Sequence, residues 1–227
     1  MARGCFVTGT DTEIGKTLIS TALLLACRRH ELSAVGMKPV AAGAIEVNGQ
    51  QTNEDVEALV SASSIAADGA LVNPYLFSPP IAPHIAAEEA NEQIDASRIA
   101  DCYRQLSAMA DIVVVEGVGG FRVPLSNGFD TADLATKLAL PVVMVVGLRL
   151  GCINHALLTA EAIRARALTC IGWVANQIDP QMERLKQNIA ALDSLLDMPR
   201  LGYVEYLDEP KPETVALRLR LPEELVA

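Results

Sequence analysis

The sequence has few aromatic residues and no apolar run long enough to cross a membrane. Only 4% of its 227 residues are Phe, Trp or Tyr. The longest apolar run, over residues 138–148, is interrupted by Pro141 and falls well short of the roughly 18 residues that a spanning helix needs. We therefore expect no membrane partner. Hydrophobic residues make up 51%, most of them aliphatic, which is typical of buried parallel strands covered by helices.

Basic clusters and grouped histidines are also missing. The chain has 18 Lys and Arg against 28 Asp and Glu, a net charge of −10, and its longest basic run is Arg28-Arg29. Because such a surface repels a phosphate backbone, we expect no nucleic-acid partner. The three histidines, His30, His84 and His155, are dispersed, which disfavours a zinc site or a histidine nucleophile.

Cysteine usage indicates a reducing compartment. The five cysteines form no C-x-x-C pair, and each lies in an apolar stretch, at Cys5, Cys27, Cys102, Cys152 and Cys170. This pattern predicts reduced core residues. Met1 leads almost directly into a strand-like run, which leaves no room for a signal peptide. We therefore expect a cytoplasmic protein.

Strand-like and helix-like segments alternate along the whole chain. The predicted strands cover residues 4–8, 34–40, 112–116, 141–146, 170–175 and 201–204, and the predicted helices cover residues 16–29, 54–61, 95–110, 131–138, 154–166 and 182–192. Residues 41–52 are expected to form a loop, and the proline-rich residues 73–84 an irregular segment. The alternation predicts one α/β domain over residues 1–227, with a mostly parallel sheet and helices on both of its faces. Ligands of such sheets bind at the carboxyl ends of the strands.

The first of those strand ends carries a phosphate-binding sequence. Residues 9–17 read GTDTEIGKT, between a predicted strand and a predicted helix, which is the setting of a P-loop. Gly15 would let the backbone approach phosphate, Lys16 would reach the β- and γ-phosphates, and the Thr17 hydroxyl would ligate Mg²⁺. The strict motif has Gly where this chain has Thr10, so the alternative is a strand-to-helix turn that happens to contain GKT.

Two carboxylates and a second lysine follow other strands. Glu116 ends the apolar run IVVVE and precedes a glycine-rich segment, where a carboxylate is costly unless it is paired or bound to a metal. Asp55 lies near a predicted helix start, so it is either a metal ligand or an acid that favours the helix N-terminus. Lys38 ends the second strand and is either part of the phosphate site or a solvated strand-end lysine.

These motifs together resemble the dethiobiotin synthetase family. The similarity lies in GTDTEIGKT, KPVAAG, DVEAL, EGVGG, LGCINH and GWVANQ, which run in the family's order from residue 4 to about residue 177. Family members make the ureido ring of dethiobiotin from 7,8-diaminopelargonic acid, CO₂ and ATP. The resemblance implies a P-loop NTPase-like fold and a cyclo-ligase activity in biotin biosynthesis. The reaction would pass through a carbamate and a mixed carbamic–phosphoric anhydride.

The resemblance also implies a role for individual residues. Lys16 and Lys38 would be catalytic, and Thr17, Asp55 and Glu116 would hold Mg²⁺. The ATP site would comprise Glu13, Ile14, Gly15, Lys16, Thr17, Leu18, Asp55, Glu116, Gly117, Val118, Gly119, Asn176, Gln177, Glu205, Tyr206 and Leu207. The diamine would bind at Thr12, Lys38, Ala42, Gly120, Gly151, Cys152 and Asn154. The chain departs from the family at Ala42, where Ser is common, and at Glu205, where the family often has a proline turn.

Residues 151–154 are also a candidate anion site on local grounds. The preceding strand is expected to end near Gly147 and the next helix to begin at about Asn154. Free N–H groups and the helix dipole favour an anion such as the carboxylate tail of the diamine. The alternative is ordinary capping by Asn154. In the resembled family this segment comes from the partner subunit, so the resemblance implies a homodimer.

Three other classes of protein fit the sequence less well. A switch or partitioning ATPase of the same fold is the main alternative, but such proteins carry a second lysine early in the P-loop, where this chain has Asp11. A glutamine-dependent synthetase generally has a long glutaminase region, for which 227 residues leave no room. A dinucleotide-binding module would show G-x-G-x-x-G after the first strand, and none is present.

Overall fold

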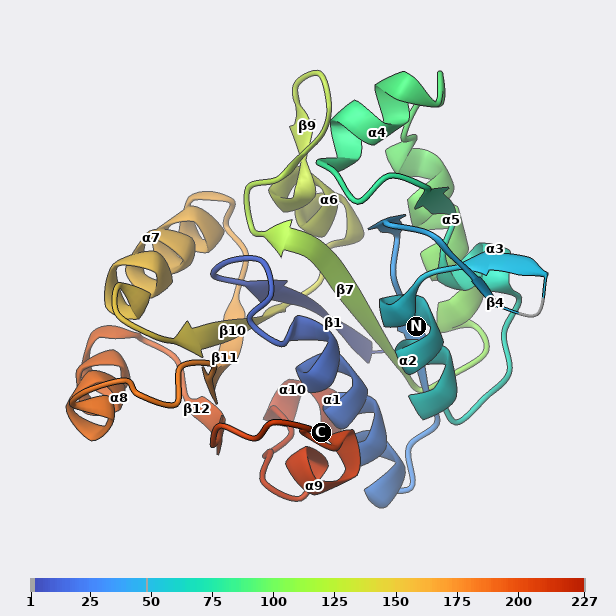
Figure 1. Cartoon of the computed structure of the whole chain (residues 1–227). Helices are drawn as coiled ribbons and strands as arrows, with labels where there is room; N and C mark the ends of the chain where they lie inside the picture. Colours follow the sequence, from blue (N-terminus) through green and yellow to red (C-terminus); the bar gives the residue numbers. More distant parts are fainter. Residues whose placement is uncertain (1–2, 48, 227) are drawn as a thin grey trace.

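A six-stranded parallel sheet forms the centre of the protein (Figure 1). The computed structural model describes residues 3–47 and 49–226. The sheet has the order β12-β11-β10-β1-β7-β2, and each of its described pairings is parallel. Its strands are β1 (Arg3–Gly9), β2 (Ala34–Met37), β7 (Ile112–Gly120), β10 (Val142–Leu148), β11 (Cys170–Gln177) and β12 (Arg200–Val204). The expected parallel α/β architecture is confirmed.

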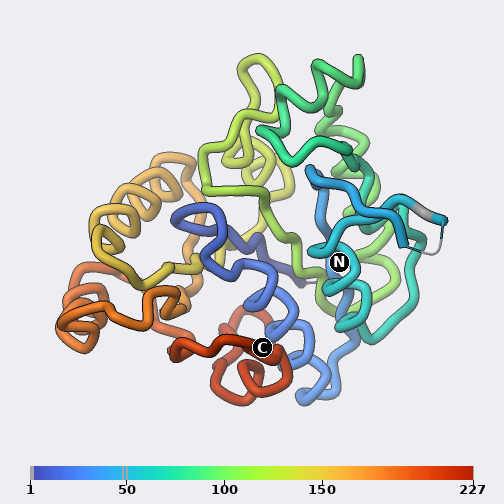
Figure 2. Tube along the Cα trace, in the orientation of Figure 1, coloured from blue at the N-terminus to red at the C-terminus, as the bar shows by residue number. Residues whose placement is uncertain are grey.

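Helices cover both faces of this sheet. They are α1 (Lys16–Arg29), α2 (Glu54–Ala62), α3 (Gly69–Val72), α4 (Pro83–Glu89), α5 (Ala96–Ser107), α6 (Thr131–Leu138), α7 (Cys152–Ala165), α8 (Leu185–Leu195), α9 (Pro212–Ala216) and α10 (Glu223–Val226). One hydrophobic cluster joins the sheet to α1, α9 and α10, and the other joins it to α5, α6, α7 and α8. The tube trace shows the first helix and the C-terminal segment side by side (Figure 2).

The strands are buried because both of their faces meet helices. All seven residues of β10 are buried. Its alternate residues enter opposite clusters, Met144 on one face and Val145 on the other, as the period of two in a strand requires. Trp173 is fully buried in β11. None of the five cysteines, all of which are described, forms a disulfide; four are buried, and Cys170 is half-buried.

Several segments differ from the sequence-based expectation. The second strand ends at Met37 and a separate strand, β3 (Val40–Ala42), follows, because Pro39 has no N–H to continue the ladder. β3 pairs in parallel with β6 (Tyr75–Phe77), inside the stretch expected to be irregular. That stretch also contains the start of α4, which has Pro83 in its first turn, a position where proline is tolerated.

Short hairpins make up most of the remaining differences. The expected loop 41–52 contains the antiparallel pair β4 (Ile45–Val47) and β5 (Gln50–Thr52). A second hairpin pairs β8 (Pro124–Ser126) with β9 (Phe129–Asp130). It leads into α6, whose start is fixed by reciprocal hydrogen bonds between Asp130 and Asp133, a capping box in form. In the described part of the chain, no helix is both long and apolar enough to cross a membrane.

Candidate active site

The phosphate loop, residues 9–15, connects β1 to α1. Glu13 and Gly15 have positive φ angles of 57° and 83°. A side chain on Gly15 would come within 2.3 Å of the Asn176 amide nitrogen, so this position needs glycine. The Ile14 side chain is buried and packs against Gly147, so Ile14 can meet a nucleotide only through its backbone. The loop thereby presents N–H groups at the start of α1, which favours a bound anion.

Lys16 begins α1 and lies almost entirely out of solvent. Its ammonium donates a hydrogen bond to the Asp11 carbonyl across 3.1 Å, and 7% of the residue is exposed. Burial, assisted by the positive charge of Lys38, lowers the pKa of Lys16 to about 8. A bound phosphate would therefore provide the negative charge that this lysine needs to stay protonated.

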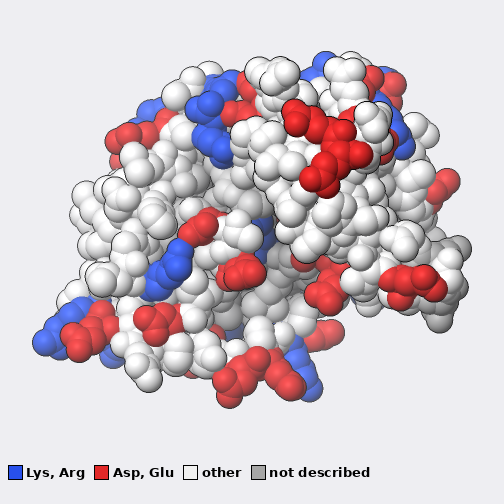
Figure 3. Space-filling model, turned by 45° about the horizontal axis from the view of Figure 1, so that its top comes forward, with Lys and Arg blue, Asp and Glu red and all other residues white. Residues whose placement is uncertain are grey.

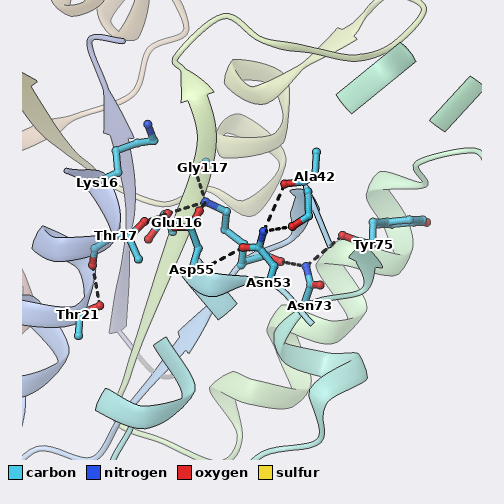
Figure 4. A network of polar contacts seen from close by, with 12 residues as sticks. Lys16, Thr17, Thr21, Ala42, Asn53, Asp55, Asn73, Tyr75, Glu116 and Gly117 are labelled. Atoms are coloured by element: carbon cyan, nitrogen blue, oxygen red, sulfur yellow. Dashed lines mark hydrogen bonds and ion pairs between the residues drawn. The ribbon is translucent and has the colours of Figure 1, made fainter. Parts of the chain in front are cut away.

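A second lysine, Lys38 directly after β2, joins Asp55 of α2 to Glu116 within β7. The Lys38 Nζ lies 2.7 Å from Asp55 Oδ2 and 2.6 Å from Glu116 Oε1. The Thr17 hydroxyl is 2.6 Å from Asp55 Oδ1 and 2.9 Å from Glu116 Oε1. Figure 4 shows Thr17, Asp55 and Glu116 pointing toward one another, while the Lys16 ammonium points away from them. We call Lys16, Thr17, Lys38, Asp55 and Glu116 the inner cluster.

Opposite charges stabilise one another within the inner cluster. Burial disfavours the charged form of Lys38, but Glu116 and then Asp55 outweigh it and raise the lysine's pKa. Burial likewise opposes ionisation of Asp55, but Lys38 and the Thr17 hydroxyl hold the pKa of that carboxyl below its usual value. Glu116 is fully buried, and its Oε2 has no hydrogen-bond partner among the described residues. That oxygen is available to a cation entering the cluster.

The inner cluster opens onto a cleft of about 710 Å³. Figure 3 shows the hollow in this face of the molecule, with Lys or Arg atoms inside it and acidic side chains at its rim. The polar residues that line the cleft are Thr12, Glu13, Lys16, Thr17, Lys38 and Asp55, and the other lining residues are Gly15, Gly119, Ala41, Ala42, Pro80, Ile81, Ala82, Pro83, Val118 and Val123. The lining thus offers charged groups that suit phosphate and an apolar wall that suits an alkyl chain.

The glycine-rich segment after Glu116 is strand rather than loop. β7 continues to Gly120, which pairs with Gly9 at the end of β1, so the expected strand end at Glu116 is wrong. Gly117 accepts a hydrogen bond from Lys38 across 3.4 Å, and Val118 and Gly119 line the cleft. The pairing register shifts here, since Val7 pairs with Glu116 but Gly9 pairs with Gly120, so β7 contains two extra residues where it reaches the start of the phosphate loop.

A second group of predicted residues lies beyond β10, and we call it the base-side group: Asn176, Gln177, Glu205, Tyr206 and Leu207. Asn176 is buried and donates a hydrogen bond to the Ile14 carbonyl across 2.8 Å. The Gln177 side-chain oxygen accepts from the Tyr203 hydroxyl at 2.7 Å and from the Tyr206 N–H at 3.3 Å. Only Asn176 among these residues touches the phosphate loop in the contacts described. Leu18 lies in the first turn of α1 and is partly buried against the hydrophobic core.

Residues 151–154 lie apart from the cleft of their own chain, since none of them is among its described lining residues. The expectation that the helix begins at Asn154 is wrong, because α7 begins at Cys152, directly after Gly151 with φ of 96°. Asn154 is therefore inside the helix and does not cap it. Leu150, just before this segment, is 95% exposed. Gly151 and Asn154 are exposed as well, whereas Cys152 is buried.

Sequence reasoning missed several residues that shape the site. Asn53 caps α2 and its side-chain amide also donates to the carbonyls of Ala42 and Gly43, which fixes the cleft wall beside Lys38. Its position before a predicted helix was a cap signal, but nothing local indicated the contact with Ala42. The apolar wall around Pro80 and Ile81 could not be predicted, because these residues lie in the proline-rich stretch that was expected to be irregular. The fold of that stretch depends on the pairing of β3 with β6.

Comparison with known proteins decides between the classes of nucleotide-binding enzyme. A family model described as an AAA domain matches residues 3–214. The chain is 55% identical over 220 residues to the ATP-dependent dethiobiotin synthetase BioD of Aromatoleum aromaticum, covering 97% of this chain and 98% of that protein. The BioD protein of Janthinobacterium sp. is 54% identical, with coverage of 95% and 93%. The chain belongs to the ATP-dependent dethiobiotin synthetase family. It is therefore an enzyme of the cyclo-ligase class.

Solved structures of more distant proteins share only the fold. A ParA family ATPase from Chlorobium tepidum superposes with a TM-score of 0.56, 12% identity and coverage of 100% of this chain and 98% of that chain. MinD from Pyrococcus horikoshii, solved with Mg-ADP, gives a TM-score of 0.54 at 12% identity, with coverage of 90% and 82%. These similarities confirm a P-loop NTPase fold. The switch or partitioning function considered from the sequence gains nothing from them, because fold alone does not determine activity.

Proposed function

We propose that this enzyme uses ATP to join CO₂ to both amines of 7,8-diaminopelargonic acid, giving dethiobiotin, ADP and phosphate. The observation that carries the proposal is the inner cluster: two buried lysines, a hydroxyl and two carboxylates at one end of the sheet. Such a set suits phosphoryl transfer, in which positioning and charge stabilisation provide most of the catalysis. The two dethiobiotin synthetases that match nearly the whole chain support this choice of substrate.

The proposed reaction has three balanced steps. One amine adds to CO₂ and loses a proton, which gives a carbamate. A carbamate oxygen then attacks the γ-phosphorus of ATP, ADP leaves, and a mixed carbamic–phosphoric anhydride forms. The second amine attacks the anhydride carbonyl, loses its proton and expels phosphate as the ring closes. Lys16 and Lys38 would stabilise the negative charge on the carbamate and on the transferring phosphoryl group.

The proposed ATP site extends from the phosphate loop to the base-side group. The backbone of residues 13–18 would hold the phosphates at the start of α1, with Lys16 beside them and Gly117 to Gly119 facing them across the cleft. The Asn176 side chain uses its amide nitrogen for the hydrogen bond to the Ile14 carbonyl. Its side-chain oxygen would contact the adenine. Gln177 and residues 205–207 would border the base, and the hydrogen bond from the Tyr206 N–H to the Gln177 side-chain oxygen supports that grouping.

The inner cluster also fits a magnesium ion carried in with the nucleotide. Among the described residues no group of three His, Cys, Asp or Glu side chains is placed to hold a metal alone. Thr17, Asp55 and Glu116 nevertheless offer one hydroxyl and two carboxylates, and the buried Glu116 Oε2 has no hydrogen-bond partner in the part of the chain that the structure describes. Mg²⁺ at phosphate sites takes one or two carboxylates and completes its shell with phosphates and water. When bound, the ion would neutralise charge on the β- and γ-phosphates.

The diamine is proposed to bind between the two walls of the cleft. Thr12, Lys38 and Gly120 would face its amines, and the alkyl chain would lie against the apolar wall that contains Ala42, Pro80 and Ile81. Ala42 provides no hydroxyl, so the substrate contact of the more common serine is replaced by van der Waals contact here. The Ala42 carbonyl accepts a hydrogen bond from Asn53, which keeps the wall in place.

The carboxylate tail is proposed to bind at Gly151, Cys152 and Asn154 of a partner subunit in a homodimer. These residues lie at the N-terminus of a 14-residue helix and do not line the cleft of their own chain. Gly151 and Asn154 are exposed beside Leu150, which agrees with a role across a subunit interface, whereas the Cys152 side chain is buried.

Phosphate release tests the proposed function directly. The purified protein is incubated with MgATP and bicarbonate, with and without diaminopelargonate, while phosphate and dethiobiotin are measured. We expect phosphate and dethiobiotin in equal amounts, and only when the diamine is present. ATP hydrolysis at the same rate without the diamine would instead indicate a switch ATPase.

A further inference from the structure

An ion pair ties the phosphate loop to the connection between β10 and α7. Arg149 directly follows β10, and its Nη2 donates to Asp11 Oδ2 in the phosphate loop, 138 residues away in sequence. Both side chains are about half exposed. Figure 1 shows the loop after β1 next to the segment that enters α7. This contact spans two strand ends that lie side by side, since β1 pairs with β10.

Asp11 makes three contacts at the tip of the phosphate loop. Its Oδ2 binds Arg149, its Oδ1 accepts from the Thr12 N–H at 2.8 Å, and its carbonyl accepts from Lys16 Nζ at 3.1 Å. The residue before it, Thr10, donates its N–H to the Val145 carbonyl of β10 across 3.0 Å. The orientation of the Asp11 peptide therefore determines where the Lys16 ammonium is held.

The rest of the loop has a backbone that needs external support. Glu13 is a non-glycine residue with a positive φ of 57°, and Gly15 follows with 83°. Such conformations persist when surrounding contacts hold them. Asn176 on β11 holds the Ile14 carbonyl at one side of the loop, and Arg149 holds Asp11 at the other.

Charge gives the pair a second effect. An unpaired carboxylate in a loop that binds phosphates would repel them. Arg149 offsets the charge of Asp11 without occupying the N–H groups of the loop. A half-exposed ion pair contributes little to the stability of a fold, so its main effect is expected at the loop itself.

We propose that Arg149 is a positioning residue for phosphoryl transfer: by binding Asp11 it fixes the phosphate loop and hence the ammonium of Lys16. The inference rests on the proposed function, because it assumes that Lys16 acts on the nucleotide phosphates. Arg149 acts through Asp11 and need not touch the nucleotide itself.

Four variants separate this role from its alternatives: Arg149→Met, Arg149→Lys, Asp11→Asn and the double variant Asp11→Asn/Arg149→Met. The control is Arg164→Met on α7. It breaks an exposed ion pair between Arg164 and Asp197, neither of which belongs to the phosphate loop. Each protein is assayed for kcat and for the KM of ATP and of the diamine. The affinity for a fluorescent ADP analogue and the melting temperature are measured as well.

We expect Arg149→Met to lower kcat/KM for ATP by roughly 10- to 100-fold, the scale of a positioning error of about 1 Å. ADP-analogue affinity should fall with it, while the KM of the diamine and the melting temperature match those of the control. Asp11→Asn should lower kcat/KM for ATP by a smaller factor, because it removes the carboxylate that repels phosphate at the same time as it removes the ion pair with Arg149. The double variant should resemble Asp11→Asn, and Arg149→Lys should recover part of the loss.

Two outcomes would overturn the proposal. If Arg149→Met is as active as Arg164→Met, the ion pair is only a surface contact. The second outcome concerns the double variant. If its kcat/KM for ATP falls by the product of the factors measured for Asp11→Asn and Arg149→Met alone, Arg149 acts on the nucleotide independently of Asp11. An inactive wild-type protein would instead contradict the proposed function, which keeps the two failures distinct.

Discussion

The inner cluster and residues 205–207 of the base-side group are held in opposite ways. Lys38 and Glu116 are buried within hydrogen-bond distance of each other, and Thr17 bridges Glu116 to Asp55. In the base-side group, Glu205, Tyr206 and Leu207 follow the last strand of the sheet and are exposed. Charges that are buried together must remain paired or bind a ligand. Exposed residues tolerate change, so substitutions in the two groups should differ strongly in their effects.

The largest effect is expected for Lys16→Ala. In the proposed mechanism Lys16 contacts the nucleotide phosphates, and removal of one such electrostatic contact commonly costs about 3 kcal/mol in the transition state, a rate loss of about 10²-fold or more. Turnover is measured from phosphate release, and folding from circular dichroism and the melting curve. Near-normal turnover by the folded variant would remove Lys16 from the mechanism.

A complementation experiment tests whether each active site uses both subunits. Lys16→Ala and Gly151→Glu should each be inactive alone, and heterodimers of the two should regain partial activity, because one of the two sites then has both intact halves. Gly151→Ala is the matched control, since it imposes the same strain at φ of 96° without the added charge. Failure of purified heterodimers to regain activity would mean that each subunit builds its site alone.

Glu116→Gln and Asp55→Asn should separate metal binding from stability. Both variants remove a carboxylate charge near Thr17, so both should raise the Mg²⁺ concentration needed for half-maximal activity. Each variant weakens one ion pair of Lys38, but the Glu116 side chain is fully buried whereas that of Asp55 is 39% exposed. Glu116→Gln should therefore cost more unfolding free energy than Asp55→Asn, roughly 1–3 kcal/mol. Urea denaturation measures that difference. If the metal requirement is unchanged while diamine affinity collapses, Glu116 contacts the substrate instead.

The sequence predicted the inner cluster better than the rest of the site, for physical reasons. Glu116 stood out because a carboxylate after an apolar strand needs a partner, and α1 was predicted with its observed bounds. The start of α7 was misjudged because the positive φ of Gly151, which cannot be seen in the sequence, ends the preceding turn before Asn154. The bond between Asp11 and Arg149 depends on the neighbouring positions of β1 and β10, and no local pattern contains that information.

The lowered pKa of Lys16 predicts that nucleotide binding takes up a proton in mildly alkaline solution. Burial and Lys38 lower this pKa to about 8 in the free protein, and bound phosphates would raise it. Above about pH 8 the free lysine is partly neutral, so binding must protonate it, and affinity should fall as the pH rises. Calorimetry in two buffers of different ionisation heat measures the uptake. Lys16→Arg, which stays charged, should show none; equal uptake in both proteins would assign the proton to another group.

The smallest effect is expected for Tyr203→Phe, which removes a hydrogen bond to Gln177 of the base-side group. Its hydroxyl donates to the Gln177 side-chain oxygen at 2.7 Å, and that oxygen also accepts from the Tyr206 N–H, so Gln177 keeps one partner when the hydroxyl is lost. We expect a roughly threefold rise in the KM of ATP, within the net value of one hydrogen bond, with kcat unchanged. Tyr103→Phe on α5 is a control for the loss of a partly buried tyrosine hydroxyl elsewhere. A fall in kcat comparable to that of Lys16→Ala would show that the base side governs phosphoryl transfer, and the contrast between the two groups would then be wrong.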